Sequence, residues 1–176
     1  PHALARQDAR RADAAVKPDA AAQAPLYPSL KAQAEALGQA FIAGDYKKVA
    51  ERTYPRLVEM AGGAKALADF LTREMQKAEA DGFKVLSYEV GDPEPAARLG
   101  DALYAVVPTT MRAQTPIGVA TQPSFMIGVS RDGGENWTFV GGTGSTSAEQ
   151  LRVLLPEAWG KLKLPEVKPP TLEPKK

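Results

Sequence analysis

The chain contains no cysteine, and its single histidine is His2. The lack of cysteine excludes disulfides, thiolate metal ligands and cysteine nucleophiles. Because His2 falls in a segment that we expect to be disordered, a histidine base in the core and a histidine metal site are excluded as well. We therefore expect neither a cofactor nor a bound metal. The lack of thiols fits an oxidising compartment, although many cytosolic proteins also lack cysteine.

An excess of charge of one sign and a long apolar run are missing too. The chain holds 22 lysines and arginines against 21 acidic residues, so we expect no basic surface for nucleic acid or for an anionic membrane. No apolar run approaches the roughly 18 residues of a transmembrane helix. Because the chain begins with Pro1, we expect a processed or expressed product from which any signal peptide has been removed.

Both ends of the chain lack the apolar periodicity of a packed element. Residues 1–28 are rich in alanine with mixed charges, which predicts a disordered tether to a secretion or lipid-anchor point. The prolines of residues 165–176 predict an extended, polyproline-like tail. Residues 29–164 are enough for one domain with a core. We expect a periplasmic or secreted protein, with possible membrane tethering through the N-terminal segment.

Helical spacing of apolar residues predicts three helices in the first half of the domain. Ser29 is the expected N-cap of the first helix, and Asp45 is the expected N-cap of the second. The second helix should end before Pro55, because proline disfavours helical geometry in the residue that precedes it. A third helix is expected between Gly63 and Gly82.

From Phe83 the apolar pattern becomes that of extended strands. Ser147 and Gln150 then form a capping box that opens a short C-terminal helix before Pro156. The order of elements predicts an α+β domain, with N-terminal helices packed on a strongly curved, cone-shaped antiparallel sheet. About four strands are expected, over residues 83–90, 103–114, 119–130 and 136–140.

Residues 130–139, "SRDGGENWTF", fit a pattern that is similar to the Asp-box of sialidases and related propellers. Hairpin chemistry accounts for it: Asp132 accepts amides of its own loop, two glycines supply positive φ, and Trp137 packs over the turn. A single copy cannot form a propeller, so we interpret it as a structural turn without a role in sugar binding. A calcium site at Asp132, Glu135 and Asn136 is disfavoured, because calcium needs more oxygen ligands.

Five segments carry a resemblance to a known family: "AGDYKKV", "YPRLVEMAGG", "YAVVP", "SRDGGENWTF" and "LLPEAW". Together with the order of helices and strands, they resemble the nuclear transport factor 2-like (cystatin-like) superfamily, in particular its secreted bacterial members of unassigned role. The resemblance covers roughly residues 30–165. It implies a cone-shaped α+β scaffold. That superfamily includes isomerases, dehydratases, transport adaptors and binding modules, so the activity must be argued from the site itself.

A small molecule is expected at the mouth of such a cone, in a mostly apolar cavity with few polar groups. Alternation along the strand at 103–114 places Tyr104 and Arg112 on one face. With Tyr54 and Trp137 they are the candidate ligand-binding residues. For each of them, ordinary packing with the polar tip in water is the alternative.

We expect a non-catalytic binding module of the cell envelope, which takes a small apolar molecule or a protein partner in or on the sheet. Homodimerisation through an open sheet face is possible. The alternative is a small isomerase or hydro-lyase that uses Glu74 or Asp101 with Tyr54 or Tyr104, and a third possibility is a structural role in an envelope assembly. An enzyme needs a buried acid with a raised pKa beside a pocket, whereas a binding module needs an exposed apolar patch.

Overall fold

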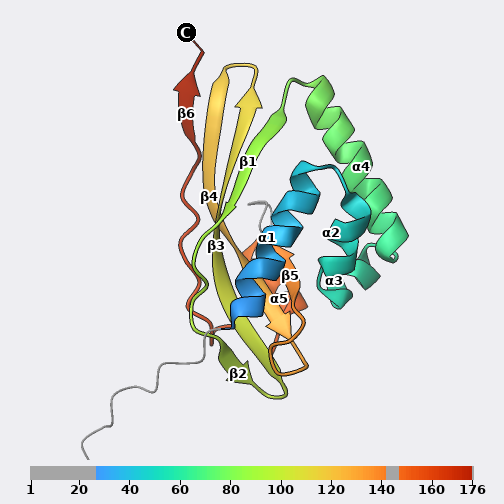
Figure 1. Ribbon diagram of the computed structural model, residues 1–176, viewed down its shortest axis with the longest axis vertical. Coiled ribbons are helices and arrows are strands. Elements are labelled where there is room, and N and C mark those ends of the chain that lie inside the picture. Colours follow the sequence, from blue (N-terminus) through green and yellow to red (C-terminus); the bar gives the residue numbers. More distant parts are fainter. Residues whose placement is uncertain (1–26, 142–146, 176) are drawn as a thin grey trace, which may run out of the picture.

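The computed structural model of the protein describes residues 27–141 and 147–175. The expected α+β class is confirmed: within these residues four helices precede the strands, and a short fifth helix lies between the last two strands (Figure 1). Of the tether expected at residues 1–28, residues 1–26 lie outside the described residues. The helices are α1 (Pro28–Ile42), α2 (Tyr46–Arg52), α3 (Pro55–Met60), α4 (Ala64–Ala80) and α5 (Ala148–Leu154).

The sheet is built on a long antiparallel hairpin of two strands, β3 (Ala102–Thr115) and β4 (Gly118–Ser130), which pair along their whole length. Shorter strands pair with both sides of this hairpin and the sheet stays open. Figure 1 shows α1 to α4 gathered on one side of the hairpin, with α4 outermost. The strands beside β3 are β1 (Lys84–Val90) and β2 (Ala97–Leu99), and those beside β4 are β5 (Thr138–Gly141) and β6 (Thr171–Pro174).

Three elements differ from the sequence-based expectation. Helix α3 is additional, because Pro55 starts a helix as its first residue instead of only ending the previous one. Strand β2 has three residues, too few for a periodic signal. Strand β6 lies in the proline-rich tail that was expected to be polyproline-like, yet Leu172 and Glu173 pair with β4. Pro174 is tolerated because it ends an edge strand.

Side-chain caps were predicted at the N-termini of three helices, and two of the three predictions are confirmed. Asp45 caps α2 by accepting the amide of Lys48, and Ser147 forms the expected capping box with Gln150. The prediction for Ser29 is wrong: the N-cap of α1 is Tyr27, which makes no side-chain cap. Ser29 lies inside the first turn and bonds to the Asp-box hairpin instead.

Both faces of the β3–β4 hairpin are covered in its buried half. The alternation expected along β3 is confirmed, since Leu103 and Val107 join the core beneath α1 while Tyr104 faces α5 on the other side. On β4, Met126 and Ile127 likewise point to opposite faces. The open face that was expected to receive a partner is therefore filled here by α5 and the segment that follows it.

The Asp-box hairpin closes on the first turns of α1. Asp132 accepts the amides of Glu135 and Asn136 at 3.2 and 3.0 Å and the hydroxyl of Ser130 at 2.8 Å. These bonds, with the Asn136 backbone first, lower the pKa of Asp132 from 3.8 to about 2. Trp137 is only 1% exposed, and its Nε1 donates to the carbonyl of Gly134 at 3.0 Å, so the indole packs over the turn as expected.

We expect Asp132→Asn to flatten the acid dependence of stability. A carboxyl with a depressed folded pKa stabilises the fold above its unfolded pKa of 3.8, and this contribution is lost as the pH falls toward about 2. The amide oxygen can accept the three bonds that Asp132 Oδ1 accepts. Its NH2 group loses the bond from Asn136 Nδ2 to Oδ2 at every pH, and the amide does not titrate in this range. Urea unfolding at several pH values should show that the free energy of unfolding falls more steeply with decreasing pH in the wild type than in the variant. Parallel curves would contradict the depressed pKa of Asp132.

Candidate functional site

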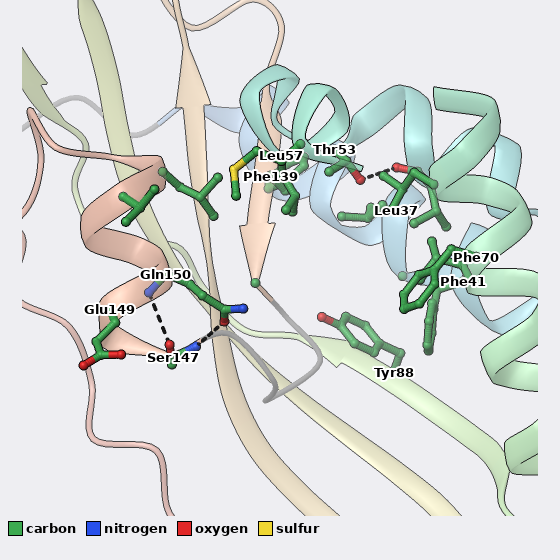
Figure 2. A pocket seen from close by; sticks show the side chains of 18 residues that line it. Leu37, Phe41, Thr53, Leu57, Phe70, Tyr88, Phe139, Ser147, Glu149 and Gln150 are labelled. Atoms are coloured by element: carbon green, nitrogen blue, oxygen red, sulfur yellow. Dashed lines mark hydrogen bonds between the residues drawn. The ribbon is translucent and has the colours of Figure 1, made fainter. Parts of the chain in front are cut away.

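A cavity of about 850 Å³ lies between the helical layer and the β5–α5 end of the domain (Figure 2). Its walls are mostly aliphatic and aromatic. The described residues that line it come from every helix and from two strands: Leu37, Gly38, Phe41, Val49, Thr53, Leu57, Met60, Leu67, Phe70, Leu71, Tyr88, Phe139, Gly141, Ser147, Glu149, Gln150, Val153 and Leu154.

The outer wall is formed by α3, α4 and α5, and it carries unusually exposed apolar side chains. Helix α4 packs on α2 and α3, which hold it away from the sheet. Leu67 is buried, but Met60, Phe70 and Val153 keep 63%, 49% and 49% of their surface exposed. An apolar patch of this kind beside a cavity marks a surface that is suited to binding. The cavity therefore reaches solvent along an apolar rim.

The inner wall is fixed by a close approach of α1 to β1. A Cβ atom at Gly38 would lie 2.6 Å from Cδ1 of Tyr88, so only glycine lets the helix rest on this ring. Phe41 contacts the same ring, with centroids 6.2 Å apart. Burial raises the pKa of Tyr88 to about 12, so its hydroxyl stays protonated at neutral pH. The ring is thus a neutral, firmly packed part of the wall.

Polar groups gather at the α5 end of the cavity. Gln150 Oε1 accepts the amide of Ser147 at 2.8 Å, and Ser147 Oγ accepts the amide of Gln150 at 3.2 Å. On the opposite wall, Thr53 Oγ1 donates to the carbonyl of Val49 at 2.8 Å. Among the described lining residues the one carboxylate belongs to Glu149, which is exposed. The cavity itself has the character of an apolar binding site, without a buried acid.

Tyr54, Tyr104 and Asp101 lie together, but outside the cavity lining. Arg131 bonds to Asp101 at 3.2 Å and to the Tyr54 side chain, and the bond to Tyr54 is the main cause of its raised pKa. Tyr104 is fully buried and donates to Glu157 at 2.9 Å. Burial, followed by that bond, raises the pKa of Tyr104 to about 12. This cluster ties β3 to α3 and to the C-terminal segment.

The remaining candidates are also outside the cavity lining. Trp137 is buried beneath Tyr27, with ring centroids 5.5 Å apart. Arg112 lies on β3 and pairs with Glu173 of the C-terminal strand at 3.8 Å. Glu74 is exposed on α4.

The residues that line the cavity were partly visible in the sequence. Leu67, Phe70 and Leu71 lie at helical spacing in the sequence, but nothing local showed that this helix face would stay half open. Leu57 and Met60 belong to α3, a helix that the pattern did not predict. Their convergence with α5 joins segments about 90 residues apart, so no short motif signals it.

Comparisons with protein-family models, with curated proteins and with solved structures find no significant match to this chain. No helix within residues 27–141 and 147–175 is long and apolar enough to cross a bilayer. In the same ranges, no three histidine, cysteine, aspartate or glutamate side chains lie close enough to hold a metal ion.

We expect the effect of Gly38→Ala on stability to change sign with the residue at position 88. In the wild type the added methyl overlaps the Tyr88 ring, and overpacking of this kind costs about 1–3 kcal/mol. In a Tyr88→Ala background the overlap is gone, and alanine should stabilise α1 by up to about 1 kcal/mol through its helix propensity. A double-mutant cycle by urea unfolding measures both values, and equal costs in the two backgrounds would contradict the contact.

Proposed function

We propose that the protein is a non-catalytic binding module that holds a small apolar molecule in the 850 Å³ cavity. The observation that carries this proposal is the size of the cavity together with its apolar walls. Ligand pockets measure about 300–1,000 Å³ and are lined mainly by apolar and aromatic side chains with a few polar groups. An apolar ligand that covers these walls removes apolar surface from water, which is favourable.

Electrostatics support binding over catalysis. A general acid or base on this scaffold needs a carboxyl group held in an apolar site beside the ligand. The described lining contains Glu149, which is exposed, and Tyr88, whose pKa is raised to about 12. A tyrosine hydroxyl with a pKa this high is not poised to exchange a proton near neutral pH. The two acids of the enzymatic alternative, Glu74 and Asp101, are both exposed away from the cavity lining.

The cavity is preferred to a sheet face as the binding site. The buried half of the hairpin is covered by α1 on one face and by α5 on the other. We propose further that the domain is of the nuclear transport factor 2-like type and acts in the cell envelope. The order of helices before an antiparallel sheet supports the nuclear transport factor 2-like type. The absence of cysteine supports the envelope location.

We expect the neutral dye Nile red to bind saturably, and Phe70→Asp to weaken it. Phe70 lines the cavity, so a carboxylate there would face an apolar ligand. A loss of about tenfold in affinity, equivalent to about 1.4 kcal/mol, is expected from fluorescence titration. The matched control is Leu86→Asp on β1, because Leu86 is 45% exposed and lies outside the lining.

Both variants should keep the wild-type unfolding midpoint, since both side chains are exposed. Failure of the wild type to saturate, or an equal loss in Leu86→Asp, would contradict a ligand in this cavity. Native mass spectrometry of protein purified gently from its source would then identify a natural occupant by its mass.

A further inference from the structure

The edges of the sheet are protected in different ways. Strand β1 carries Lys84 and Glu89, and its pairing has a break in register over residues 85–87. Strand β2 has only three residues. The edge of β5 is covered where the amide of Tyr54 donates to the carbonyl of Phe139 at 2.9 Å. Charged side chains, irregular register, short strands and covering segments all keep an edge from pairing with another chain.

Strand β4 has no such protection of its own over residues Gly118–Gln122, which we call the covered edge. This stretch carries no charged residue and no proline. It is covered instead by the tail, residues 165–175, which runs along the β4 side of the hairpin (Figure 1). Strand β6 pairs with the first four residues of the covered edge, and Gln122 Nε2 donates to the carbonyl of Lys168 at 2.9 Å.

The covered edge admits a strand backbone at close range. A Cβ atom at Gly118 would overlap the carbonyl oxygen of Glu173, so a side chain at this position would push the tail away. The tail in turn presents an outer side with four prolines and the charges of Glu173 and Lys175. Prolines and charges make a poor template for a further strand. The tail therefore replaces an unprotected edge by a protected one.

The tail is held mainly through its backbone. Each of its residues from Pro165 to Lys175 has an exposed side chain. The ion pair between Arg112 and Glu173 spans 3.8 Å and joins two exposed side chains, so it adds little stability. A segment with few buried apolar contacts opens at a low free-energy cost, while the rest of the domain stays folded. Opening of the tail exposes the covered edge.

We propose that the covered edge is a self-association surface that the tail keeps closed, and that release of the tail lets the covered edges of two copies pair. Two identical edges meet about a two-fold axis as antiparallel strands, which joins two open sheets into one. Because the covered edge has no charge, this pairing brings no like charges opposite each other. The surface is separate from the proposed ligand site, since none of its residues belongs to the described cavity lining.

The alternation of the ladder provides matched variants for a test. Lys175 donates its amide to the carbonyl of Ile117 at 3.2 Å, and hydrogen-bonded pairs alternate along an antiparallel ladder. The amides of Glu173 and Thr171 therefore face β4 as well, whereas the amide of Leu172 points away from it. Thr171→Pro/Glu173→Pro removes two ladder donors and should release the tail, and the control Leu172→Pro removes none.

Sedimentation velocity on the intact chain measures the result. We expect the double variant to shift toward a dimer as its concentration rises, relative to the wild type and to Leu172→Pro. At low concentration, the amides of Val119 and Thr121 should exchange with deuterium faster in the double variant, because they lose their partners in the tail. An excess of a synthetic peptide of residues 165–176 should occupy the covered edge and reverse the shift.

Three results would overturn the proposal. Unchanged amide exchange in the double variant would show that the tail is not held by this ladder. Faster exchange with the sedimentation of the wild type would show that a free covered edge does not pair with itself. A dimer that the peptide does not dissociate would place the contact on another surface.

Discussion

The placement of α1 against the sheet determines most of the structure, and it depends on the burial of Trp137. Ser29 Oγ donates to the carbonyl of Gly134 at 2.6 Å and accepts from Trp137 Nε1 at 3.2 Å. Gln33 donates to the carbonyl of Glu135 and accepts the amide of Trp137 at 3.0 Å. The indole thus brings its own hairpin into contact with the helix, and its burial leaves no polar atom unpaired.

The same helix sets the inner wall of the cavity. A Cβ atom at Gly128 would lie 2.7 Å from Leu30 Cδ1, and a Cβ atom at Gly38 would overlap Tyr88, so α1 lies close to the sheet at both points. Helix α2 then separates α4 from the strands, and the apolar stripe of α4 has no sheet to cover it. The space that remains is bounded on its far side by α5. This helix buries Leu151 and Leu154 in the core on the Tyr104 side of the sheet and turns Val153 toward the cavity.

The polar side chains of the core are used for structure. Tyr104 and Glu157 bond to each other, and Arg131 joins Tyr54 to Asp101. In these pairs each buried group finds a partner, which avoids the cost of an unpaired polar atom. The described lining of the cavity, by contrast, is mostly aliphatic and aromatic.

Local chemistry was sufficient to determine the class of the fold from the sequence. Asp45 and the Ser147–Gln150 pair define helix starts through bonds that span three residues, and alternation along β3 assigns each side chain to a face. These features depend on neighbours in the chain, so a single sequence contains them. The Asp-box turn was predictable for the same reason.

Tertiary structure alone decided where Ser29 bonds, how the proline-rich tail pairs with β4, and which apolar faces meet around the cavity. Each of these depends on contacts between residues far apart in the chain, whose geometry follows from the packing of whole helices on the sheet. Tyr54 and Tyr104 illustrate the limit: both are amphipathic and near a core face, yet packing turned them toward Arg131 and Glu157. The cavity lining comes from other residues of the helices and of β1 and β5.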